Sequence, residues 1–121
     1  NERPEEYTNI QTVTLDDYFR GEEIDMIKID VEGFELEVIE GGKKLLENNK
    51  NMKIISEFGG YYYKRNKPKV LYPKILHEMG FNLFGVIDKS TGKSKIVNKN
   101  FDELMEFYSK TNSFILNLIW K

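Results

Sequence analysis

The alternation of apolar and polar residues at positions 24–33 is the clearest pattern along the chain. The stretch reads Ile-Asp-Met-Ile-Lys-Ile-Asp-Val-Glu-Gly, so Ile27, Ile29 and Val31 would share one face of a strand and the intervening residues the other. A helical pattern follows directly. A short apolar strand followed by a helix is the unit of parallel sheets, so we expect this strand to be covered on both faces.

The rest of the chain alternates between helical and extended patterns. Strands are expected at 24–30, 52–58, 81–87, 94–97 and 114–120, helices at 15–19, 34–46, 68–79 and 101–108, and a surface loop at 61–67. The Gly41-Gly42 pair should interrupt the second helix. Thr14 is the expected N-cap of the first helix, and Asn100 or Asp102 that of the last. A turn is expected at 88–93. This order predicts an α/β layered sheet with its helices on one face.

The other face of the predicted sheet has almost no sequence left to cover it. The chain therefore has the pattern of half of a doubly wound α/β fold. We expect residues 1–23 to form a linker and a short helix leading into the sheet, and residues 24–121 to form the C-terminal half of the domain.

Composition narrows the possible functions. The 121 residues are 40% hydrophobic and 31% charged, which is typical of a globular domain. A net charge of −2 gives no reason to expect a nucleic-acid or membrane partner. The absence of cysteine excludes disulfides, thiolate metal sites and a cysteine nucleophile. No signal-peptide pattern is found, so a cytoplasmic location is the default expectation. The sequence leaves the oligomeric state open, a homo-oligomer included.

Two acidic residues stand where the first strand meets the following helix. Ligands of parallel sheets bind outside the carboxyl ends of the strands, and Asp30 and Glu32 would lie there. Such carboxylates can serve as a general base, orient a substrate or bind a divalent cation. The structural alternative is that Asp30 caps the helix, while the negative charge of Glu32 merely interacts favourably with the positive N-terminus of the helix.

Lys28 needs a partner if its strand is buried on both faces, because an unpaired buried charge is costly. Glu57 ends the next strand at a similar height, so we expect Lys28 to pair with Glu57 or Glu32. A catalytic lysine is the alternative. Tyrosines 61–63 either line a substrate pocket or simply pack, and the basic run at 64–69 is either a solvated loop or a site for an anionic substrate.

The sequence Ile-Lys-Ile-Asp-Val-Glu-Gly at 27–33, with Leu-Asp-Asp at 15–17 and Gly41 downstream, resembles the FkbM family of S-adenosylmethionine-dependent methyltransferases. The strand that ends in Ser56-Glu57 is similar to the next strand of that family. The resemblance implies a Rossmann-like sheet with parallel strands and an antiparallel last strand between the second and third strands or beside them. It also implies methyl transfer from S-adenosylmethionine to a hydroxyl of a small molecule or glycan.

The resemblance favours a functional role for Asp30, and less so for Glu32. With methyl transfer as the reaction, we assign Asp30 as base or orienting group, Glu32 as a helper at the helix start, and Glu57 and Lys28 as supporting groups. The family's relatives hold the cofactor with a glycine-bearing turn after the first strand and an acidic residue after the second. Neither motif occurs here, so we assign no cofactor-binding residue beyond an edge contact at Asp30 and expect most of those contacts upstream, in a longer chain. The 121 residues alone are expected to be inactive.

Two other classes of function remain open. One is a non-catalytic interaction or scaffold domain, and the other is a metal-dependent hydrolase that uses Asp30, Glu32 and Glu57. Metal-dependent O-methyltransferases also carry carboxylates at the positions of Asp30 and Glu57 but add an asparagine, where this chain has Phe58. We therefore assign no metal site.

Overall fold

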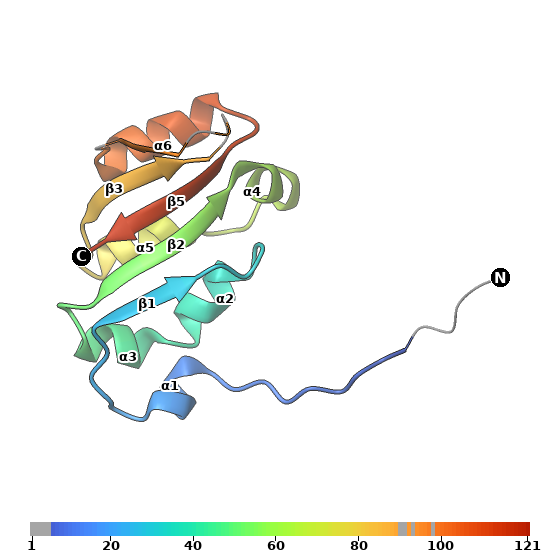
Figure 1. Cartoon of the computed structure of the whole chain (residues 1–121), viewed down its shortest axis with the longest axis vertical. Helices are drawn as coiled ribbons and strands as arrows, with labels where there is room; N and C mark the ends of the chain where they lie inside the picture. Colours follow the sequence, from blue (N-terminus) through green and yellow to red (C-terminus); the bar gives the residue numbers. More distant parts are fainter. Residues whose placement is uncertain (1–5, 90–91, 93, 98) are drawn as a thin grey trace.

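A computed structural model describes residues 6–89, 92, 94–97 and 99–121 and shows an open five-stranded sheet (Figure 1). The strand order is β1 (Met26–Ile29), β2 (Lys53–Gly59), β5 (Ile115–Trp120), β3 (Leu83–Asp88) and β4 (Lys95–Val97). β1 and β2 are parallel, and β5 is antiparallel to both β2 and β3. The predicted α/β class and the antiparallel last strand between two parallel ones are therefore confirmed.

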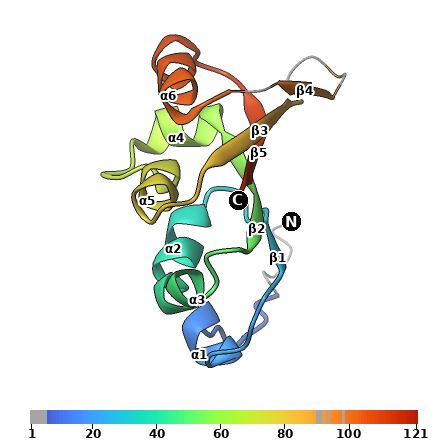
Figure 2. The ribbon, with the colours of Figure 1, turned by 90° about the vertical axis from the view of Figure 1, so that its left-hand side faces the viewer.

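Helices cover one face of the sheet, as Figure 2 shows for α2 to α6. The helices are α1 (Leu15–Phe19), α2 (Glu35–Glu40), α3 (Lys43–Asn48), α4 (Gly60–Asn66), α5 (Tyr72–Glu78) and α6 (Phe101–Lys110). The strand residues that face them form the core, which includes Ile54, Phe58, Leu118 and Trp120. Among the described residues, no helix is long and apolar enough to cross a membrane.

The expected burial of β1 on both faces is wrong. Met26 is 54% exposed, and the side chain of Lys28 is 61% exposed. No helix within the described ranges lies on that side of the sheet (Figure 2), which is why alternate residues of β1 face water. The expectation that one face of the sheet would lack a cover is confirmed. The general rule that parallel strands are covered on both faces therefore does not hold for β1 among the described residues.

The expected loop at 61–67 is also wrong, because this segment forms helix α4. Gly60 begins the helix directly beneath the ring of Phe114, where a Cβ atom would lie only 2.3 Å from the ring. Tyr63 is 1% exposed and packs on Phe58 with 4.9 Å between ring centroids. Tertiary packing of aromatic rings, which local propensity does not report, stabilises this helix.

The other helices agree with the predicted bounds to within two residues at each end, except at the start of α5. α5 begins at Tyr72, with Pro73 in its first turn, and not at Pro68. Asn100 forms the N-terminal capping box of α6 with Glu103. Part of the expected turn at 88–93, namely positions 90, 91 and 93, lies outside the described residues, as do positions 1–5 of the expected linker.

The Leu-Asp-Asp motif fastens α1 to α3. Thr14 caps α1 by accepting a hydrogen bond from the amide of Asp17, as predicted. The carboxylate of Asp16 accepts hydrogen bonds from the amides of Lys44 and Leu45, at 3.2 and 2.8 Å. These amides belong to the first turn of α3, so a residue of one helix caps another. The predicted break at Gly41-Gly42 is confirmed, since α2 ends and α3 begins there.

Candidate functional site

The loop between β1 and α2 carries the two predicted carboxylates, Asp30 and Glu32. Two consecutive residues of this loop are left-handed: Glu32 has φ 49° and Gly33 has φ 101°. This conformation is uncommon for a residue with a Cβ atom. The N-cap position of α2 is Phe34, which makes no side-chain capping bond, so the alternative that Asp30 caps this helix is wrong. The loop is a tight turn that projects both carboxylates to the surface.

Glu35 holds this loop from below and was not singled out from the sequence. It is 1% exposed. Its Oε1 atom accepts hydrogen bonds from the amides of Val31 and Gly33 at 3.4 and 3.3 Å, and its Oε2 atom accepts one from the Tyr63 hydroxyl at 2.7 Å. The available signal was an acidic residue one turn before Ile39, on the buried face of the helical pattern.

Two tyrosines of α4 pack against the same loop. A Cβ atom on Gly33 would lie 2.4 Å from the ring of Tyr62, so only glycine fits beneath that ring. Burial, and then the hydrogen bond to Glu35, raise the pKa of Tyr63 well above its usual value. For Tyr63, which is buried, the packing alternative is confirmed, and the ring of Tyr62 packs on the loop at Gly33. The side chain of Tyr61 lies outside the described part of the structure.

Lys28 pairs with Asp30 and not with Glu57 or Glu32, which corrects the expected pairing. Its Nζ atom lies 3.3 Å from Oδ2 of Asp30. The two residues are two positions apart, so their side chains leave β1 on the same, uncovered face of the sheet. The lysine side chain is 61% exposed and the aspartate side chain 35% exposed, so water screens this pair.

Glu57 lies next to Asp30 at the carboxyl ends of the two parallel strands. The register pairs Ile29 with Ser56, which makes Asp30 and Glu57 the next neighbours. Burial raises the pKa of Glu57 above its usual value, the charge of Asp30 raises it further, and Lys89 opposes the shift. The Lys89 ammonium lies 4.0 Å from Glu57 Oε2. The structure thus brings Asp30 and Glu57 together, each with a lysine beside it.

An amide that sequence reasoning missed stands beside this pair. Asn117 of β5 lies directly opposite Glu57 and is 6% exposed. It could be found only once β5 was known to lie next to β2. Within the described residues, no group of three or more histidine, aspartate or glutamate side chains is arranged to hold a metal ion. The metal-dependent hydrolase therefore gains no support.

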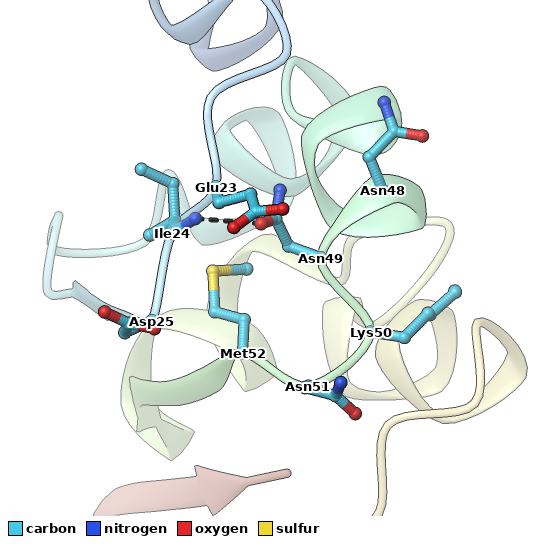
Figure 3. A pocket seen from close by; sticks show the side chains of 8 residues that line it. All are labelled: Glu23, Ile24, Asp25, Asn48, Asn49, Lys50, Asn51 and Met52. Atoms are coloured by element: carbon cyan, nitrogen blue, oxygen red, sulfur yellow. Dashed lines mark hydrogen bonds between the residues drawn. The ribbon is translucent and has the colours of Figure 1, made fainter.

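The opposite end of the sheet holds a polar pocket of about 250 Å³ between the segments 23–25 and 48–52 (Figure 3). Asn49 ties its walls together. The Asn49 Oδ1 atom accepts a hydrogen bond from the amide of Ile24 at 2.8 Å, and its amide group donates to the carbonyl oxygens of Leu45 and Glu22. This pocket lies at the amino ends of β1 and β2, whereas ligands of such sheets bind at the carboxyl ends.

Comparison with known proteins gives one match. A family model described as the methyltransferase FkbM domain matches residues 1–111, which include the whole of the loop between β1 and α2. No curated protein and no solved structure matches the chain.

Proposed function

Because the chain belongs to the FkbM methyltransferase family, we propose that it transfers the methyl group of S-adenosylmethionine to a hydroxyl oxygen of a small molecule or glycan. The observation that carries this proposal is the pair of neighbouring carboxylates, Asp30 and Glu57, at the carboxyl ends of two parallel strands. This is the end of an α/β sheet at which ligands bind.

In the proposed reaction, Asp30 accepts the proton of the acceptor hydroxyl. A new bond forms between the hydroxyl oxygen and the methyl carbon, while the bond between that carbon and the sulfonium sulfur breaks. S-adenosylmethionine, when bound, supplies this electrophilic methyl group. Direct transfer needs positioning above all, which Lys28 provides by holding Asp30, while Glu57 and Glu32 line the approach.

We propose further that these residues act in a longer chain with a Rossmann-like sheet, whose upstream residues hold most of the cofactor. Two features support this proposal. Among the described strands β1 pairs with β2 alone, so one of its edges is free, and one face of the sheet has no helix over it. Calorimetric titration of residues 1–121 with S-adenosylmethionine should show binding no tighter than the millimolar range, about −4 kcal/mol. Micromolar binding would contradict this division.

Methyl transfer is tested with the natural chain that contains these residues, S-adenosylmethionine labelled in the methyl group, and a panel of sugars, polyols and phenols. Label should enter a hydroxyl acceptor. Asp30→Asn should lower kcat by about 10²- to 10⁴-fold and leave cofactor affinity unchanged, because it removes a proton acceptor at nearly constant shape. Asp25→Asn, at the amino end of β1, is the matched control. Absence of label in every hydroxyl would refute the proposal, and unchanged turnover in Asp30→Asn would remove Asp30 from it.

A further inference from the structure

Glu35 combines a buried carboxylate with bonds to the loop that bears the candidate catalytic groups. We propose that Glu35 is a positioning residue: by holding the amides of Val31 and Gly33, it fixes loop 30–33 and so aims Asp30 and Glu32 at the reacting hydroxyl. This inference rests on the proposed methyl transfer. It assigns no contact between Glu35 and the substrate, because the side chain is only 1% exposed.

The loop needs such a support because its conformation is unfavourable by itself. Glu32 at φ 49° has a Cβ atom in the left-handed region, and strained backbone of this kind persists only where surrounding contacts hold it. Hydrogen bonds from two amides to a charged acceptor are stronger than those to a neutral acceptor. Glu35 supplies that acceptor from the first turn of α2, directly after the loop.

Helix α4 links this support to the second carboxylate. Tyr63 donates its hydroxyl to Glu35 at 2.7 Å, and Tyr62 lies on Gly33. The same helix follows β2, the strand that carries Glu57. One helix therefore sets the position of the Asp30 loop relative to Glu57, and a loosened Glu35 would change the spacing of the pair.

Two variants, Glu35→Gln and Tyr63→Phe, test the role. Amide hydrogen exchange at Val31 and Gly33 should become about tenfold faster in each, because the charged acceptor or its hydroxyl partner is lost. In the active natural chain kcat should fall about 10- to 100-fold while the KM for S-adenosylmethionine changes little, since a displaced catalytic group affects turnover more than cofactor binding. Tyr63→Phe leaves the Glu35 carboxylate in place, so this variant still tests the inference if Glu35→Gln does not fold.

Asn49→Ala is the matched control, since it removes a comparable buried network at the other end of the sheet. It should leave the exchange at Val31 and Gly33 and the turnover unchanged. Unchanged exchange in both test variants, faster exchange with normal turnover, or an equal response in Asn49→Ala would each overturn the inference. If the unmodified chain transfers no methyl group, the proposed function fails, and the exchange data alone still decide whether Glu35 orders the loop.

A cleft of about 440 Å³ lies at the end of α4 and is bordered also by α5 and α6. Four lysines line it, at positions 64, 67, 69 and 74, together with Tyr108 and no acidic residue. None of the four forms an ion pair with any described residue. Lys64 is held against the cleft wall, with its Nζ atom 4.0 Å from the centroid of the Tyr108 ring.

We infer that this cleft binds a phosphate group. Clefts lined by one sign of charge concentrate counter-ions, and lysine is a common phosphate ligand. The concentration of positive charge is local, because the chain as a whole has a net charge of −2. The size of the cleft is within the range of small-ligand pockets. The anionic alternative for the basic run at 64–69 is thereby favoured over the solvated loop.

Titration with inorganic pyrophosphate, followed by amide chemical shifts, tests this inference. Shifts should gather at residues 64–74, and Lys67→Gln with Lys69→Gln should weaken binding about tenfold, because two charged contacts are lost. Lys43→Gln with Lys44→Gln changes the charge equally outside the cleft and should have little effect. Binding to phosphatidate vesicles but not to pyrophosphate would identify a lipid headgroup as the source. No response to either probe, or equal weakening in the control pair, would refute the site.

Discussion

The carboxyl and amino ends of the sheet are each tied together by one buried polar side chain. At the carboxyl end Glu35 binds two loop amides and the Tyr63 hydroxyl. At the amino end Asn49 binds one amide and two carbonyl oxygens. The first is a charged group beneath left-handed residues, one of which it bonds directly, and the second is a neutral amide whose bonded residues, Glu22, Ile24 and Leu45, have no positive φ angle.

The two side chains differ in what they stabilise. Asn49 joins two segments of the chain, whereas Glu35 holds a loop in an unfavourable backbone conformation. At the amino end a neutral amide satisfies the backbone groups of residues without positive φ angles, while the left-handed residues Arg20 and Gly21 simply end helix α1, where such backbone is common. The strained turn at the carboxyl end uses a charge-assisted acceptor, and it presents Asp30 and Glu32 to solvent. Strain of this kind gathers at functional sites, which supports the carboxyl end as the site of chemistry.

The largest expected effect is that of Gly33→Ala. The new methyl group would meet the Tyr62 ring at 2.4 Å in a backbone with φ 101°, so the free energy of unfolding should fall by about 3 kcal/mol. Gly80→Ala is the control, because its φ of 94° is similar but nothing lies within 4 Å. Urea unfolding measures both. Equal losses in the two variants would show that Tyr62 does not press on the loop.

At the amino end, Asn49→Ala should lower the free energy of unfolding by about 2 kcal/mol, because it leaves partly buried backbone groups of Ile24, Glu22 and Leu45 without partners. The same urea titration applies. Asn48→Ala, one residue earlier on an exposed position, should change stability far less. A loss of methyl transfer in Asn49→Ala, at unchanged folding, would erase the contrast between the two ends.

Glu57→Gln, unlike the variants above, should raise the stability of the fold, and the gain should depend on pH. Since the pKa of Glu57 is raised above its usual 4.5 in the folded protein, the group stabilises the fold least when it is ionised. The variant should therefore melt at a higher temperature than the wild type near pH 8, and the difference should vanish below about pH 4. Thermal unfolding across this range tests it. A variant that melts lower at pH 8 would mean that Lys89 outweighs burial and Asp30.

Lys28→Met should have the smallest effect, below about 1 kcal/mol, because the ammonium is 61% exposed and its pair with Asp30 is screened. Full burial of the strand would instead have implied a loss of several kcal/mol. Thermal unfolding at low and at moderate salt gives the measurement. A large, salt-independent loss would indicate that this face of β1 is covered in solution.

Local sequence signals predicted the parts of the fold that local interactions determine. The caps at Thr14 and Asn100 and the helix break at Gly41-Gly42 depend on neighbouring residues. Thr14 and the break were predicted correctly, and Asn100 was one of the two caps predicted for its helix. Helix α4 was missed because it is stabilised by packing on Phe58 of the preceding strand and on Phe114, which lies far along the chain. Neither ring is part of the helix's own pattern.

The candidate site divides in the same way. Asp30 and Glu57 were found because both end apolar strands, and the structure places them side by side. The partner of Lys28 depends on whether a helix covers that face of β1. No residue near Lys28 in the sequence indicates whether it does. Glu35 also bonds Tyr63, 28 positions away, so its network could be recognised only once the two elements were brought together. The catalytic roles of Asp30, Glu32, Glu57 and Lys28 stay predictions.

The capping of α3 by Asp16 has a consequence for how the protein folds. The amides that it caps lie 28 and 29 positions later in the chain, so this cap forms only when a loop containing β1 and α2 has closed. Closing such a loop costs chain entropy before the contact is made, whereas a cap supplied by the preceding residue costs almost none. Helix α3 should therefore become stable late, together with the docking of α1, and not as an early local nucleus.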